Sequence, residues 1–160
     1  MSSSSSSSSS VSPASEYTMA TATAKFSHGF PALLGLEFLE WEEGRVVVGM
    51  QVDERHLNLG RRVHGGVLAT LLDVAGACAG TFCPYPDRIR KALTLSMTTT
   101  FTGQAGPGYI RAIGVKRAGG SRIFNSTVEV YSEDDTLLIL GEGTFRLRSD
   151  SQDPRGAPIA

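Results

Sequence analysis

Cysteine is scarce in this sequence: Cys78 and Cys83 are the only two among 160 residues. Two thiols five positions apart, in or beside an apolar segment, match neither a disulfide framework nor a zinc-binding pattern. An excess of charge is also missing, because the formal net charge is −1. The few cysteines suggest a protein of a reducing compartment. The near-zero net charge gives no electrostatic attraction to nucleic acid or to an anionic membrane.

A long hydrophobic run is missing as well. The most apolar stretch, residues 63–82, approaches the roughly 20 residues that a membrane-spanning helix needs. It contains four glycines, however, and Asp73 lies in its middle. A central carboxylate costs about 2.5 to 3.5 kcal/mol in such a helix. The sequence thus predicts no membrane span and a cytoplasmic protein.

Large apolar residues are rare in the first 25 residues, where Ser2 to Ser10 form an unbroken serine tract. Such a segment buries too little surface to offset its ordering entropy. It lacks the apolar region of a secretory signal, and its high serine content without arginine matches a transit peptide only in part. We predict that residues 1–25 are disordered, with an organellar location as the alternative if this segment is a targeting sequence.

The remaining chain combines one helical pattern with several strand patterns. Apolar residues over 63–82 recur at spacings of one, three and four, which is typical of a helix with one broad buried face. Short turns join most strands, and this favours antiparallel pairing. We predict an α+β domain over residues 26–148, followed by a flexible tail over 149–160. Its sheet has about five to six strands around one long central helix, and the strand patterns cover 36–41, 45–52, 92–101, 109–116, 123–131 and 137–147.

Asp73 is the one charge in the predicted helix. It lies nine residues after His64, which is about 13 Å along a helix. Gly65 and Gly66 begin this helix, where unpaired N–H groups and the helix dipole can polarise a carbonyl oxygen. Asp73 cannot reach a carbonyl held at the start of its own helix, but it can reach one held by a second copy. The spacing therefore indicates a site shared across a dimer interface.

Simpler interpretations of these residues remain open. Asp73 could be a solvated carboxylate or pair with an arginine, and the two glycines could make only a tight helix entry. Asn58 could donate its amide N–H to the same carbonyl or only stabilise a turn. His64 could be a base, a donor to a leaving group or the residue that begins the helix. A metal held by His56, His64 and a carboxylate lacks a ligand pair of standard spacing, so we predict no metal site.

Basic residues gather in loops near the ends of the predicted helix and strands. They would suit a phosphorylated ligand, although a solvated surface would contain the same residue types. The residues are Arg61, Arg62, Arg88, Arg90, Lys91, Lys116, Arg117 and Arg122.

The spacing of Asn58, the His64-Gly65-Gly66 triplet and Asp73 resembles the signature of PaaI-like hotdog-fold acyl-CoA thioesterases, including the thioesterase superfamily member 2 type. The resemblance extends over about residues 33–148, and the spaced set is more specific than the triplet alone. The sequence departs from the pattern at Arg61, where many members of the family have glycine.

The resemblance implies a hotdog fold and a homodimer, commonly a homotetramer, that hydrolyses a fatty-acyl or aryl-acyl coenzyme A. Coenzyme A is part of the substrate, and no separate cofactor is implied. Gly65 and Asn58 would polarise the carbonyl, Asp73 of the neighbour would activate water or attack directly, and His64 would lie by the leaving sulfur. Thr94 would partner the acid, with Ser96 as its rival. The implied substrate-binding residues are Gly66, Arg61, Arg62, Arg117, Gly120, Ser121 and Arg122.

Other functions fit the same residues. A non-catalytic acyl-CoA-binding module would use the same pocket and leave its ligand intact. A hotdog enoyl-CoA hydratase is less favoured, since no His–Asp dyad spacing is present. A scaffold that only shares the fold would not bind acyl-CoA saturably. The acyl group itself is left open, because Phe38, Phe82, Met97 and Phe101 could line an apolar tunnel or belong to the core.

Overall fold

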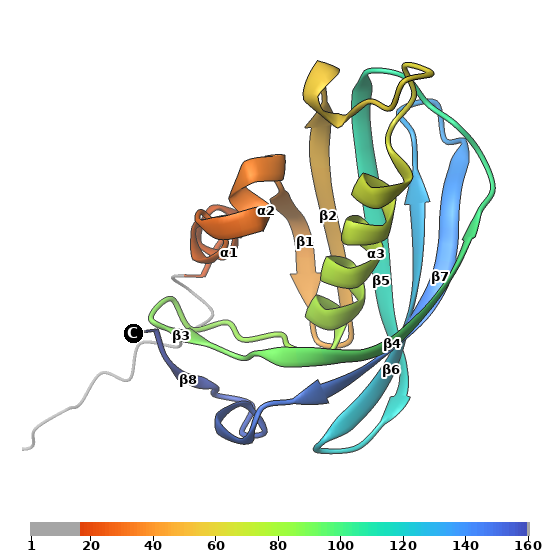
Figure 1. Cartoon of the computed structure of the whole chain (residues 1–160). Helices are drawn as coiled ribbons and strands as arrows, with labels where there is room; N and C mark the ends of the chain where they lie inside the picture. Colours follow the sequence, from red (N-terminus) through yellow and green to blue (C-terminus); the bar gives the residue numbers. More distant parts are fainter. Residues whose placement is uncertain (1–16, 160) are drawn as a thin grey trace, which may run out of the picture.

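The computed structural model of the chain describes residues 17–159 (Figure 1). The predicted disorder of residues 1–16 thus lies outside the described residues. In chain order the elements are α1 (Met19–Lys25), α2 (Gly29–Leu34), β1 (Glu37–Glu42), β2 (Arg45–Val52), the 3-10 helix η2 (Glu54–His56), α3 (Gly65–Ala79), β3 (Arg88–Ile89), β4 (Ala92–Phe101), β5 (Gly108–Gly119), β6 (Ile123–Tyr131), β7 (Leu137–Leu147), the 3-10 helix η3 (Ser149–Ser151) and β8 (Ala157–Pro158).

Six strands form one sheet in the order β1-β2-β5-β6-β7-β4, and every neighbouring pair is antiparallel. The sheet curves around α3, which lies in its concave side (Figure 1). Glycine turns and β-branched runs produce the long strands, as the sequence patterns indicated. The predicted α+β class, with an antiparallel sheet around one central helix, is confirmed. No helix within residues 17–159 has the length and apolarity needed to cross a membrane.

The core lies between α3 and the sheet. The helix buries one apolar face, including Leu68, Leu71 and Leu72, against side chains such as Val48 and Met50 of β2. Each fully buried side chain of this size contributes about 1.5 to 3 kcal/mol relative to exposure. Phe38 was predicted either to line an apolar tunnel or to belong to the core, and it is buried in this core.

Glycines let the helix backbone approach the sheet. A Cβ atom added to Gly114 of β5 would lie 2.3 Å from the carbonyl oxygen of Ala75 in α3. A Cβ added to Gly76 of α3 would lie 2.7 Å from the ring of Phe145 in β7. The side of α3 that carries Gly76 is therefore occupied by close contacts with the sheet. These contacts fix the distance between α3 and the sheet.

We expect the substitution Gly114→Ala to lower the free energy of unfolding by about 3 kcal/mol, because overpacking here must displace helix backbone and not a flexible side chain. Chemical denaturation with an intrinsic fluorescence readout measures this change. Gly120→Ala is the matched control, since a Cβ there meets nothing within 4 Å. An unchanged unfolding free energy for Gly114→Ala would contradict the close helix–sheet contact.

Two segments differ from the predicted disorder and flexibility. Residues 19–25 form α1, whose Ala22 is fully buried. Lys25 donates hydrogen bonds to the carbonyl oxygens of Cys83 and Tyr85, at 3.1 and 2.8 Å, so that α1 is tied to the segment after α3. Burial lowers the pKa of the Lys25 ammonium. The composition of residues 1–25 did not predict this helix. It is anchored by one small buried residue, Ala22, and by the long-range hydrogen bonds of Lys25.

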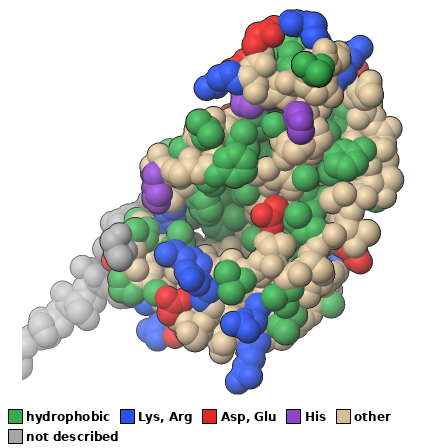
Figure 2. All heavy atoms as spheres, in the orientation of Figure 1, with side chains coloured by type: hydrophobic (Ala, Val, Ile, Leu, Met, Phe, Trp, Pro, Cys, Tyr) green, Lys and Arg blue, Asp and Glu red, His purple; other side chains and the backbone are tan. Residues whose placement is uncertain are grey.

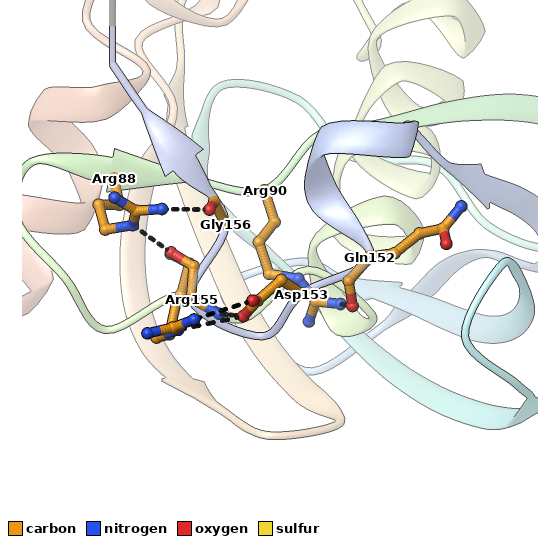
Figure 3. Close-up of polar contacts among 7 residues, drawn as sticks. Arg88, Arg90, Gln152, Asp153, Arg155 and Gly156 are labelled. Carbon is orange, nitrogen blue, oxygen red and sulfur yellow. Dashed lines mark hydrogen bonds and ion pairs between the residues drawn. The ribbon is translucent and has the colours of Figure 1, made fainter.

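The C-terminal residues 149–158 are likewise held in place (Figure 3). Strand β8 pairs with β3, and Arg88 donates to the carbonyl oxygens of Arg155 and Gly156, at 2.7 and 2.5 Å. Arg90 donates to the carbonyl oxygen of Ser151 at 2.9 Å. These residues belong to the segment predicted as a flexible tail, and in the structure arginine donors far away in sequence bind its backbone carbonyls.

Candidate active site

His64 caps the N-terminus of helix α3 and directly precedes its first residue, Gly65. Its backbone is extended, with φ −61° and ψ 135°, and its ring Nδ1 accepts a hydrogen bond from the N–H of Gly66 at 2.9 Å. An accepting Nδ1 places the proton of the neutral ring on Nε2. The N–H of Gly66 is thereby used, and of the two glycine amides only that of Gly65 has no acceptor within residues 17–159. Gly65 is therefore the donor that this helix end can offer to a carbonyl oxygen.

Asn58 holds the loop that leads into α3. Its side-chain oxygen accepts from the N–H of Arg62 at 3.1 Å, and its backbone N–H donates to the carbonyl oxygen of Arg62 at 2.8 Å. This is the turn-stabilising role considered for Asn58. Because the side-chain oxygen is engaged, the orientation of the amide is fixed, and its N–H₂ group makes no hydrogen bond within the described part of the chain.

The same loop accommodates Arg61 at a position where the family often has glycine. Arg61 has φ +59°, a left-handed conformation that costs a residue with a side chain about 1 to 2 kcal/mol. Its N–H donates to the carbonyl oxygen of Asn58 at 2.9 Å, and its guanidinium pairs with Glu54 at 2.5 Å. These contacts offset the strain, so that the loop keeps a glycine-type conformation without glycine.

Asn58 and Gly65 line one cleft of about 340 Å³. Phe101 of β4 and Leu68 of α3 form part of its apolar wall, and Arg62 lies at its polar side. The Phe101 ring lies close to the helix start, 3.3 Å from the position that a Cβ on Gly65 would take. The two predicted carbonyl-polarising residues are thus brought to one cavity.

Asp73 and Thr94 form a second group. The hydroxyl of Thr94 donates to Oδ1 of Asp73 at 2.6 Å, and Asp73 is half-buried on α3. Its carboxylate makes no ion pair with an arginine or lysine within residues 17–159. The carboxylate is therefore neither fully solvated nor neutralised, and one of its oxygens is held by a hydroxyl.

A bulge in β4 explains why Thr94 and not Ser96 meets the acid. Thr94 pairs with Phe145, whose side chain is buried under α3, whereas Ser96 pairs with the next residue, Thr144. Residues two apart on a regular strand share a face, but the bulge shifts the register between them. Thr94 is thereby on the helix side of the sheet, and Ser96 is on the opposite side.

Asp73 and Gly65 of one chain remain about 12 Å apart along α3. The sheet has an open edge at β4. This strand is the last of the sheet, and no strand lies beyond it within the described residues. Large apolar side chains of β4 are exposed, among them Leu95 at 53% and Phe101 at 54%. Figure 2 shows hydrophobic side chains gathered around a hollow on this face. The opposite edge, β1, is packed by α1 and contains three glutamates.

The other predicted substrate-binding residues lie in two places. Arg61 and Arg62 belong to the Asn58 loop. Arg117, Gly120, Ser121 and Arg122 lie in or beside the β5–β6 turn, at the other end of the sheet (Figure 1). That turn lies near the start of β4, since Ile123 and Leu93 both pair with Arg146. Within one chain, Arg117 and Arg122 are therefore far from Gly65. The β5–β6 turn lies instead on the side of Thr94.

His56 serves the fold. Only 3% of its surface is exposed, and its Nδ1 accepts from the N–H of Asp53 at 3.0 Å. Its carbonyl oxygen accepts from the N–H of His64 at 2.8 Å, which fixes the entry to α3. Among residues 17–159 no three metal-ligating side chains come together.

Comparison with known proteins gives the family. The model of the thioesterase superfamily matches residues 60–139. A protein of Archaeoglobus fulgidus named "Putative esterase" is 29% identical over 120 residues, which are 74% of this chain and 75% of that protein.

Solved structures agree with this match. A mutant of the phenylacetic acid degradation protein PaaI from Thermus thermophilus is 32% identical, with a TM-score of 0.63, and the likeness covers 73% of this chain and 96% of that one. Zebrafish thioesterase superfamily member 2 is 26% identical, with a TM-score of 0.68, over 82% of this chain and 99% of that one. The predicted resemblance and its hotdog fold are confirmed.

Proposed function

The chain belongs to the thioesterase superfamily, and we propose that it hydrolyses acyl-coenzyme A thioesters at a site shared by two copies of the chain. The observation that carries this proposal is the pair of separated groups on α3. An unpaired amide at Gly65 can hold a carbonyl oxygen, and a half-buried carboxylate at Asp73 is bonded to Thr94. Within one chain the Gly65 amide is too far from the Asp73 carboxylate for both to act on one thioester. A second copy of the chain supplies the missing group to each.

The chemistry follows from these groups. The Gly65 N–H and the Asn58 amide hold the thioester carbonyl oxygen and stabilise the negative charge that develops on it. Asp73, oriented through its Oδ1 by Thr94, takes a proton from water with its other oxygen. The resulting hydroxide adds to the carbonyl carbon, and the carbon–sulfur bond then breaks. Asp73 returns the proton to the sulfur, while Nε2–H of His64 donates a hydrogen bond to it.

The second copy would join at β4. An exposed edge strand with apolar side chains is a template for pairing with another strand, and a two-fold axis there would place the same patch on both sides. The glutamate-containing β1 edge is packed by α1 and offers no equivalent surface. A two-fold axis perpendicular to the paired β4 strands would run the two β4 strands, and with them the two α3 helices, in opposite directions. This would set Gly65 of one copy toward Asp73 of the other.

Coenzyme A would extend from this shared site to the basic residues. The β5–β6 turn, with Arg122 and the backbone of Gly120 and Ser121, lies beside the start of β4 and hence on the Asp73 side of the site. Arg62 lines the cleft of Gly65 on the other side. Guanidinium groups in these positions suit the phosphates of coenzyme A. Gly66 contributes space and not a hydrogen bond, since His64 uses its N–H.

Thiol release tests this proposal. Purified protein is mixed with acetyl-, octanoyl-, palmitoyl-, benzoyl- and phenylacetyl-coenzyme A, and free thiol is followed with a dithionitrobenzoate reagent. The protein's own thiols add little background, because Cys78 and Cys83 are buried, and burial raises the pKa of Cys78 to about 12. We expect saturable release from at least one thioester. Tight binding of an acyl-coenzyme A without any release would instead establish a binding module.

A further inference from the structure

A second cavity, of about 440 Å³, opens beside the start of α3. Its wall comes from α2 through Phe30, Leu33 and Leu34, and from α3 through Val67 and Gly66. Helix α2 precedes residues 60–139, the part of the chain that the family model matches. This cavity is therefore built partly from a segment that the family signature does not include.

The conformation of α2 explains why apolar side chains face this cavity. Gly35 ends the helix at φ +74° and turns the chain into β1, which glycine permits without strain. Leu34 is thereby buried in the core, while Phe30 and Leu33 remain 56% and 67% exposed at the cavity. Two large apolar side chains left uncovered beside a cavity are typical of a binding surface.

The cavity offers no free charge to a ligand. Arg55 at its rim is already bonded to both carboxylate oxygens of Asp53, at 3.1 and 2.9 Å. His56, which also lines it, uses Nδ1 to accept the N–H of Asp53. A charged ligand group would find no charge there that is not already paired among the described residues, whereas an apolar group would displace water from apolar walls.

The cavity lies next to the cleft of Gly65, at the same end of α3. His64 belongs to its lining and also caps α3, and Gly66 follows the Gly65 amide directly. A thioester whose carbonyl oxygen is held at Gly65 could therefore extend its acyl chain into this cavity. A methylene group has about the volume of a water molecule, roughly 30 Å³. A volume of about 440 Å³ thus corresponds to roughly fifteen methylene groups, which is enough for a medium-length acyl chain.

We propose that the cavity between α2 and α3 is the acyl-binding pocket, that Phe30, Leu33 and Val67 determine specificity, and that the substrates have uncharged hydrocarbon acyl chains of medium length. This inference rests on the proposed thioester hydrolysis and adds the substrate class to it. Burial of one methylene is worth about 0.8 kcal/mol, which corresponds to nearly a fourfold change. The wild-type kcat/KM therefore rises with chain length until the pocket is full.

The test compares kcat/KM for acetyl-, butyryl-, hexanoyl-, octanoyl-, decanoyl- and succinyl-coenzyme A. The variant Leu33→Asp introduces a charge at an exposed position of the pocket, and Phe30→Ala removes apolar wall. Leu140→Asp is the matched control, because Leu140 is an exposed leucine of β7 away from both cavities. We expect the decanoyl-to-acetyl ratio of kcat/KM to fall at least tenfold in Leu33→Asp and severalfold in Phe30→Ala, and to stay unchanged in Leu140→Asp.

The outcomes separate this inference from the proposed function. Hydrolysis with a flat chain-length profile, or with the same ratio in Leu33→Asp and wild type, overturns the acyl pocket and leaves the thioesterase intact. Preference for succinyl- over hexanoyl-coenzyme A does the same. A change of sedimentation coefficient in Leu33→Asp, with the ratio unchanged, identifies the surface as a contact between copies and also overturns the pocket. Failure of all thioesters to react contradicts the proposed function itself.

Discussion

Replacement of Asp73 by asparagine should lower kcat at least about 100-fold, the loss expected when a general base is removed. Asparagine has nearly the same shape, and its side-chain oxygen can still accept the hydrogen bond that Thr94 donates at 2.6 Å. The substitution therefore removes the proton acceptor and leaves the local packing. Thiol release at saturating acyl-coenzyme A gives kcat directly, and binding of substrate should change little.

The control for this experiment is a measurement that the Asp73→Asn variant is folded. Thermal unfolding of Asp73→Asn should match that of the wild type, since the carboxylate makes no ion pair within residues 17–159 that the change would break. Turnover close to normal in a folded Asp73→Asn variant would show that another group activates the water.

The substitution Gly65→Pro should lower kcat about 100- to 1,000-fold, which is the cost of losing one oxyanion donor. Proline at the first position of a helix removes only the N–H, and the helix does not need that group. The preceding residue must be extended when proline follows, and His64 already has ψ 135°. The backbone of α3 thus accepts proline where the proposed site loses its donor.

Gly65→Ala is the matched control, because alanine keeps the N–H. Its Cβ would lie 3.3 Å from the Phe101 ring, an exposed side chain that can move by a few tenths of an ångström. We expect Gly65→Ala to retain most of the wild-type kcat. If Gly65→Pro and Gly65→Ala were equally active, the amide of Gly65 would have no part in the reaction.

The fold followed from features that are local in the sequence. The spacing of apolar residues located α3, and β-branched runs between turn residues located the long strands, because both patterns reflect burial on one face. The resemblance to the family implied a hydroxyl partner for Asp73 and left two candidates, Thr94 and Ser96. A β-bulge decides between them, and a bulge in one strand depends on its partner, which a single strand pattern does not reveal.

Long-range contacts account for what the sequence did not predict. Helix α1 and the C-terminal residues are held by lysine and arginine donors to distant backbone carbonyls, and such pairs leave no periodic signal. The left-handed conformation of Arg61 was hidden for a similar reason. The turn role of Asn58 was one of two alternatives, and only its contacts with Arg62 show that it is present. The cavity lined by Phe30 and Leu33 needs two helices that are far apart in the chain.

The shared site is tested most directly by a heterodimer that combines Asp73→Asn in one copy with Gly65→Pro in the other, co-expressed with two affinity tags and purified through both. If each site uses Gly65 of one copy and Asp73 of the other, one of the two sites contains both functional groups. The heterodimer should then have about half of the wild-type kcat per dimer, while each homodimer has no more than about 1%. A heterodimer as inactive as its parents would show that Gly65 and Asp73 act within the same chain, and would contradict the shared site.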